Sequence, residues 1–432
     1  MPKSPLPTTL TRPLDLLRDL VPEPGAARPM AALTFAQSLG TGLFLTSSVI
    51  FFTRTAGFSA DQLAIAMSIA GVCGFLCSMP AGRIADRFGA RVPLAISYAL
   101  LGPLFFVYPF VDNLAEFVVV AALIGVCETG AGGPLRGALI HTLFGKAKAS
   151  GVRAQMRSLF NLGFTGGAAL AGLALADGSR SAFIAITTAN AVLQLSCAVI
   201  AFRLRPPADV EPVPAAPAKR SWVAIKDRRF LLATGLSGVL EFYLPVLTVG
   251  MPLWIVHRTG APGALTAVLI ALNTIMVVLF QRVASRGSET VHGSGRLLVR
   301  AGVLLAVACV LFALSGGRGA VWATVFLVPS LIALTLGELA QASGSWGLAF
   351  ALPPPDRMGE YQGVFALARG FQQFLGPALV TVLTMSLGAT GWLILAALFL
   401  VTGLAAGRAF TRQTPSDPAA SIDAAAPKEL TP

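Results

Sequence analysis

The stretch Gly82-Arg83-Ile84-Ala85-Asp86-Arg87-Phe88-Gly89-Ala90-Arg91 lies between two apolar runs, 63–81 and 92–111. Ionised side chains are costly in hydrocarbon, so this charged stretch is predicted to turn at a membrane surface between two spans. Gly82 and Gly89 favour a tight reversal, because glycine adopts positive φ without steric cost. An ordinary basic turn would explain the arginines but not Asp86 or the two glycines.

The composition places the chain in a membrane. Of its 432 residues, 55% are hydrophobic and 12% are charged, whereas soluble domains carry roughly 25% charged residues. The net charge of +12 does not indicate nucleic-acid binding, because the basic residues lie between apolar runs and report orientation. The five cysteines and three histidines show no spacing typical of disulfides or metal sites. No metal or cofactor is therefore expected.

Apolar stretches that are long enough to cross a bilayer, at about 20 residues per helix, recur along the chain. Twelve are predicted, near 30–53, 62–82, 91–111, 114–143, 153–176, 181–203, 230–256, 263–284, 297–315, 320–350, 361–386 and 389–409.

A Pro-rich connection divides these spans six and six. Most of the 32 Lys and Arg residues lie in the tails and in the loops on one side, and this bias predicts cytoplasmic termini in a multi-pass protein of the cell membrane. The expected parts are an N-terminal tail (1–29), a first six-helix bundle (30–204), a linker (205–229), a second six-helix bundle (230–410) and a C-terminal tail (411–432).

The pattern of glycines and charges from Gly82 to Arg91 resembles the signature loop of the major facilitator superfamily of secondary transporters. A partial copy, Gln281-Arg282-Val283-Ala284-Ser285-Arg286, follows the eighth span, with Ser285 in place of Asp86. The resemblance implies an all-α membrane fold of two pseudo-symmetric six-helix bundles. It also implies that Asp86 pairs with an arginine and with the N-terminus of a neighbouring helix, which closes the cytoplasmic side.

Ionisable residues inside the predicted spans are candidates for function, because each costs roughly 2.5–3.5 kcal/mol at the bilayer centre. The fourth span holds Glu128 and Arg136, the seventh Glu241 and the tenth Glu338. In the superfamily, helices one, four, seven and ten line a central cavity. The resemblance therefore makes these four residues cavity candidates, together with the polar side chains Gln37 and Tyr243.

A lone carboxylate in a low-dielectric cavity can exchange a proton near neutral pH. Glu241 or Glu338 is therefore predicted to couple transport to protons. The alternative is that these carboxylates are structural partners of arginines between packed helices. Because the expected cavity is rich in Glu and poor in cations, neutral or cationic substrates are favoured over anions.

The fifth span carries a second motif, which resembles the antiporter motif of the superfamily's drug:proton exporters. Ala168 and Ala171 stand where that motif has Pro and Gly. Small residues at this spacing also allow two helices to approach closely, which is the alternative interpretation. The residues concerned are Arg157, Asn161, Gly163, Gly167 and Gly172, with Arg369, Gln373, Gly376 and Pro377 as their counterparts in the eleventh span.

These features predict a monomeric secondary transporter in the lipid bilayer that exports small amphipathic molecules by alternating access, coupled to protons. An importer of a small metabolite and a non-transporting receptor or scaffold are the alternatives. An enzyme is not expected, because no nucleophile, base or metal cluster gathers at one depth. Nucleic acid is not expected as a partner, and no P-loop for ATP is visible.

Overall fold

A computed structural model describes residues 25–54, 59–111, 113–174, 179–204 and 223–411. Apart from one isolated bridge between Gly260 and Gly319, the regular structure in these ranges is helical. The first half contains α2 (Ala27–Arg54), α3 (Ala60–Phe88), α4 (Arg91–Val107), a 3₁₀ turn (Tyr108–Phe110), α5 (Leu114–Gly125), a π-helical segment (Val126–Ala131), α6 (Gly132–Ala174) and α7 (Arg180–Arg203).

The second half follows a connection that lies outside the described residues. Its elements are α8 (Val223–Lys226), α9 (Arg228–Leu240), α10 (Tyr243–Pro245), a π-helical segment (Val246–Gly250), α11 (Met251–Arg258), α12 (Leu265–Ala284), α13 (Val291–Ser315), α14 (Ala320–Ala351), a 3₁₀ turn (Pro355–Arg357), α15 (Met358–Thr381), a π-helical segment (Val382–Ser386) and α16 (Ala389–Thr411).

The structure confirms the all-α membrane class. Within the described ranges, nine helices or helix series are long and apolar enough to cross a membrane. The other three expected spans, 30–53, 153–176 and 361–386, coincide with α2, the second part of α6 and α15. Large apolar side chains such as Leu76 and Val321 are exposed, as expected where lipid is the solvent. The chain is a multi-pass membrane protein, and the count of twelve spans stays a prediction.

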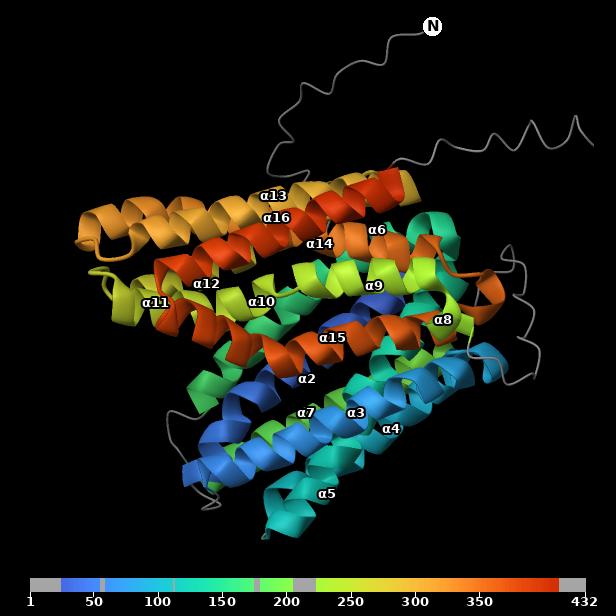
Figure 1. The fold of residues 1–432 in the computed structure, drawn as a ribbon. Coiled ribbons are helices and arrows are strands. Elements are labelled where there is room, and N and C mark those ends of the chain that lie inside the picture. Colours follow the sequence, from blue (N-terminus) through green and yellow to red (C-terminus); the bar gives the residue numbers. More distant parts are fainter. Residues whose placement is uncertain (1–24, 55–58, 112, 175–178, 205–222, 412–432) are drawn as a thin grey trace, which may run out of the picture.

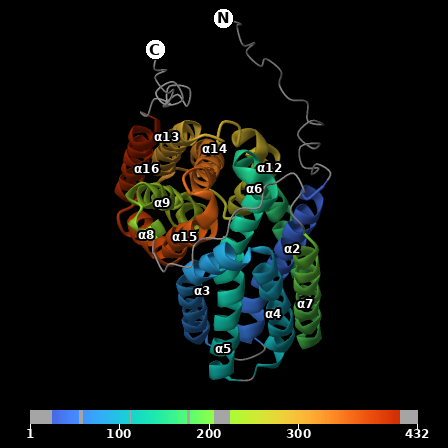
Figure 2. The same ribbon diagram turned by 90° about the vertical axis from the view of Figure 1, so that its right-hand side faces the viewer.

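The helices form two groups that follow the order of the chain (Figures 1 and 2). One buried apolar cluster lies entirely within 233–410. A second large cluster fills the first half, but it also includes Phe230, Trp346, Phe350 and Tyr361 of the second half. The two halves therefore share a continuous core over part of their contact.

The two halves also contact each other at the end of the molecule where α7 ends and α8 begins, which we call the linker end. At this linker end, Arg91 Nη1 donates to the Leu204 carbonyl at 3.4 Å, which places the α3–α4 turn beside the end of α7. The Ala224 N–H of α8 donates to Glu360 Oε1 of α15 at 3.2 Å. The predicted orientation makes the linker end cytoplasmic.

The expectation of a turn at both Gly82 and Gly89 is wrong for Gly82. Helix α3 continues to Phe88, and only Gly89, with φ of 77°, leaves the helix. Gly82 instead lies against α15, where a Cβ atom would come within 2.0 Å of the Gly359 carbonyl oxygen. The absence of a side chain lets the backbones of the two halves touch.

We expect Gly82→Ala to force α3 and α15 apart and to lower the unfolding midpoint of the purified protein by several degrees. Gly71→Ala on the same helix is the matched control, because no atom lies within 4 Å of its added Cβ. The control should match or exceed the wild-type midpoint, since alanine is the better helix former. Equal midpoints for Gly82→Ala and the wild type would contradict the close contact.

Candidate functional site

Asp86 links the two halves at the linker end. Its carboxylate accepts the Gly359 N–H through Oδ1 and the Glu360 N–H through Oδ2, the latter at 2.6 Å. Both donors belong to the first turn of α15, where backbone N–H groups lack partners within the helix and the helix dipole favours an anion. The predicted contact with a helix N-terminus is confirmed, and an arginine partner for Asp86 stays a prediction.

The other residues of this loop surround the contact. The guanidinium of Arg87 is exposed and lies 5.1 Å from the centroid of the neighbouring Phe88 ring. Arg91 binds the end of α7 through the Leu204 carbonyl. Arg83 is half-buried beside Gly82 on α3. The loop residues thus lie close together at the linker end.

Glu128 lies in the first of the π-helical segments, a feature that often accompanies functional sites. Its Oε1 accepts hydrogen bonds from Thr41 Oγ1 at 2.9 Å and from Gln37 Nε2 at 3.4 Å. Ser97 Oγ donates to the Cys127 carbonyl within the same segment. Gln37 of α2 and Glu128 therefore contact each other inside the first half, whereas the cavity that they were expected to line stays a prediction.

Arg136 lies one turn into α6 and donates from Nη1 to Tyr98 Oη of α4 at 3.0 Å. The charge of Glu128 also acts favourably on this guanidinium. Arg136 and Glu128 therefore belong to one electrostatic neighbourhood, although no direct ion pair joins them among the described contacts.

Glu241 sits at a break in the helix series of the second half. Helix α9 ends at Leu240, and Pro245 has no N–H to donate to the Glu241 carbonyl four residues earlier. That carbonyl instead accepts the Leu244 N–H at 3.0 Å. The interruption brings the Glu241 side chain to Arg369 of α15, whose Nε donates to Oε1 at 2.8 Å.

Glu338 of α14 joins the two halves at depth. One of its oxygens is ion-paired with Arg157 Nη2 of α6, and the other accepts Asn273 Nδ2 of α12 at 2.9 Å. Arg157 Nη2 also donates to Tyr243 Oη at 2.9 Å. The Glu338 side chain is 5% exposed and that of Arg157 is 23% exposed, so this ion pair is largely buried between the first and second halves.

The expectation of lone carboxylates is therefore wrong for Glu241 and Glu338. Each is held by an arginine that the sequence assigns to a helix-packing motif, Arg369 and Arg157 respectively. A charge buried without a partner costs several kcal/mol, and the arginines offset that cost. The alternative interpretation, ion pairing between packed helices, describes the geometry.

The expectation of a cation-poor site is also wrong. Arg153 lies one helical turn from Arg157 on α6, and its guanidinium carbon is 4.0 Å from the Trp346 ring centroid. Arg369 also lies over Trp346, at 5.6 Å. A cation–π contact of this kind contributes about 2 kcal/mol when desolvated, which is less than the several kcal/mol that burial of a charge costs. Four arginines thus face three carboxylates in what we call the central network: Arg136, Arg153, Arg157 and Arg369, with Glu128, Glu241 and Glu338.

The glycines of the fifth-span motif pack α6 against α2. A Cβ at Gly163 would meet Ser38 Oγ at 2.0 Å, and one at Gly167 would meet the Leu39 carbonyl at 2.1 Å. A Cβ at Gly172 would meet no atom within 4 Å, so Gly172 takes no part in this approach. Asn161 is half-buried on the same helix.

In the eleventh-span counterpart, Gly376 alone makes a close approach. A Cβ there would lie 2.8 Å from Pro245 Cγ. Gln373 and Pro377 are exposed, and Gln373 lies one helical turn from Arg369 on the same face of α15. The central network therefore gathers Arg157 and Arg369 from the two motifs, whereas Gly163, Gly167 and Gly376 pack helices against one another.

The sequence does not single out Arg153 of the central network, nor three residues that contact this network: Tyr98, Asn273 and Trp346. Two of them carried a usable signal. Arg153 precedes Arg157 by four residues and so shares its helix face, and Asn273 interrupts an apolar run. Tyr98 and Trp346 are amphipathic, and nothing in their sequence context distinguishes them from packing aromatics.

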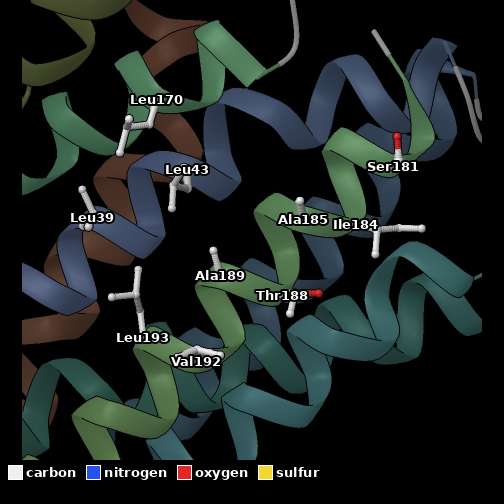
Figure 3. A pocket seen from close by; sticks show the side chains of 10 residues that line it. All are labelled: Leu39, Leu43, Leu170, Ser181, Ile184, Ala185, Thr188, Ala189, Val192 and Leu193. Atoms are coloured by element: carbon white, nitrogen blue, oxygen red, sulfur yellow. The ribbon is translucent and has the colours of Figure 1, made fainter. Parts of the chain in front are cut away.

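A separate apolar groove lies between α2, α6 and α7 (Figure 3). Leu39 and Leu43 of α2 face Leu193 and Val192 of α7 across it, and none of its lining residues is charged. Gln37 and Thr41 of the same helix α2 bind Glu128 instead. The groove therefore contributes nothing to the central network, and it is not the candidate site.

Comparisons with known proteins agree with this architecture. A family model described as Major Facilitator Superfamily matches residues 30–377. A protein of Escherichia coli (strain K12) named "Uncharacterized MFS-type transporter YdeE" is 23% identical over 339 residues, which cover 77% of this chain and 82% of that protein.

Solved structures show the same fold at low sequence identity. A bacterial homologue of the iron transporter ferroportin, in an outward-facing state, superposes with a TM-score of 0.70 at 16% identity, over 89% of this chain and 98% of that chain. The transporter FucP in the outward conformation gives 0.69 at 15% identity, over 90% and 99% of the two chains.

Proposed function

Because the chain belongs to the Major Facilitator Superfamily, we propose that it is a proton-coupled exporter of small amphipathic molecules that works by alternating access. The buried ion pair between Glu338 and Arg157 carries the proposal. It joins the two halves whose relative movement alternating access requires.

The chemistry of this pair supplies a coupling step. While Glu338 is ionised, its charge holds Arg157 of the other half. When Glu338 takes up a proton, the charge that attracts Arg157 disappears, and losing one partner of a buried ion pair costs about 3–5 kcal/mol. That is enough to shift a two-state equilibrium between conformations by two or more orders of magnitude.

The ion pair between Glu241 and Arg369 and the contact of Asp86 at the linker end both involve α15, and they take part in the proposed transport cycle. Arg369 and Glu241 hold α15 to the break between α9 and α10, and α15 is the helix whose N-terminus binds Asp86. Movement of α15 would thus change the surroundings of Glu241 together with the linker-end closure. The proposed direction, export, rests on the resemblance of the fifth-span motif to that of drug:proton exporters.

Untargeted mass spectrometry of cells and medium tests this proposal for a substrate of any chemical identity. Cells that express the wild type should release particular compounds that cells expressing Glu338→Gln retain, and an uncoupler that collapses the proton gradient should remove the difference. Enrichment of compounds inside the wild-type cells would indicate import instead. Identical profiles of the wild type and the variant would contradict the proposed role of Glu338.

A further inference from the structure

Among the described contacts, Arg153 has no acidic partner, whereas each of the other three arginines of the central network contacts a carboxylate or a tyrosine hydroxyl. Arg157 and Arg369 each bind a carboxylate, and Arg136 binds Tyr98 near Glu128. Among the contacts of the described residues, Arg153 has only the face of Trp346. Its own charge is repelled by those of Arg136, Arg369 and Arg157.

Among the contacts of the described residues, no hydrogen bond uses a donor of Arg153, so its N–H groups are available to a ligand. A guanidinium can lie on an aromatic ring through its π face, and its N–H groups then point outward in its own plane. These N–H groups form a fork that matches the two oxygens of a carboxylate or phosphate. The side chain is only half-buried, so a ligand can reach this edge.

A second donor close by is also without an acceptor. Arg157 Nε is buried and has no hydrogen-bond partner, although Nη2 of the same side chain is bound to Glu338 and Tyr243. Buried donors are normally satisfied. Arg153 and Arg157 are four residues apart on α6 and therefore share a helix face, so one anion can serve both.

From the excess positive charge, the free fork and the unpartnered Nε, we infer that the transported molecule is a small organic anion, whose carboxylate or phosphate binds Arg153 and Arg157 beside Trp346. The inference rests on the proposed transport function and specifies its substrate class. Trp346 also packs against Phe350 and Phe365 in the buried core, which fixes the ring beside which the anion would bind.

Thermal unfolding of the purified full-length protein tests the inference. It is measured with a series of aromatic probes that differ in charge, at constant ionic strength. Benzoate and phenyl phosphate are the anionic probes, and benzylammonium and benzyl alcohol are the cationic and neutral ones. The anions should raise the unfolding midpoint in a concentration-dependent manner, as expected for a ligand that binds the folded state. Equal effects of all four probes, or no effect of the anions, would overturn the inference.

Arg153→Gln locates the effect. It should weaken the apparent affinity for the anions at least tenfold and raise the midpoint of the ligand-free protein, because it removes the repulsion among the arginines. Arg318→Gln is the matched control, since Arg318 also lies over an aromatic ring, 4.8 Å from the Phe326 centroid, but outside the central network. It should leave anion binding unchanged.

Two results separate this inference from the proposed function. Unchanged anion binding in Arg153→Gln, with a lowered ligand-free midpoint, would show that Arg153 is structural and would refute the anion site. Binding in detergent requires no proton gradient, so anion binding that persists in a protein without proton-linked transport would refute the proposed function and leave the anion site standing.

Discussion

Glu338→Gln is expected to abolish accumulation driven by a proton gradient. If one proton moves per substrate molecule, a gradient of one pH unit stores about 1.36 kcal/mol and supports roughly tenfold accumulation at zero membrane potential. Gln has the shape of Glu but cannot take up a proton or attract Arg157 by charge. Flux assays in proteoliposomes, with the compound identified by mass spectrometry, should show this accumulation for the wild type and none for the variant.

Two further variants separate coupling from folding. Glu289→Gln changes an exposed carboxylate between α12 and α13, and it should transport like the wild type. The double variant Arg157→Gln with Glu338→Gln removes both charges. It should be more stable than either single variant, because each single variant leaves one charged partner unpaired and the double variant leaves none, yet it should remain uncoupled. Gradient-driven accumulation in Glu338→Gln would refute the assignment.

Asp86→Asn is expected to destabilise the closed linker end. The change removes the negative charge at the N-terminus of α15, and the amide can accept only one of the two N–H bonds at the site. A hydrogen bond to a charged group contributes about 1.5–3 kcal/mol, so the equilibrium between closed and open linker ends should shift roughly 10- to 100-fold. Turnover should fall while expression stays near normal.

Spin labels on the two halves measure this shift. Val199 on α7 and Leu404 on α16 are exposed positions on opposite halves, and their distance distribution should broaden or move in Asp86→Asn. Asp356→Asn serves as the control. The Asp356 carboxylate also lies beside the start of α15, but its side chain is 37% exposed. Identical distance distributions and flux in Asp86→Asn and the wild type would mean that the loop only sets the orientation of the chain in the membrane.

The helices could be predicted from the sequence because an apolar run of about 20 residues has few alternatives in a membrane. The same reasoning found Glu128, Glu241 and Glu338, since a charge in a span stands out. Asp86 could be placed at a helix N-terminus because the loop resembles a known signature. The identity of that helix, α15 at Gly359 and Glu360, required the structure.

The pairing of the charges could not be predicted from the sequence. Arg157 lies 181 residues from Glu338 along the chain, and Arg369 lies 128 residues from Glu241. Which arginine meets which carboxylate depends on how the two halves dock and on the break beside Glu241. Gly82 illustrates the same limit, because its contact with Gly359 depends on the other half of the molecule.

The most direct test of the central claim, that Glu338 carries the coupled proton, is proton movement measured with a pH-sensitive dye inside proteoliposomes during substrate flux. In the wild type, substrate movement should change the internal pH. In Glu338→Gln, exchange of labelled for unlabelled substrate should continue while the substrate-linked change in pH disappears. A pH change of wild-type size in Glu338→Gln would contradict the account.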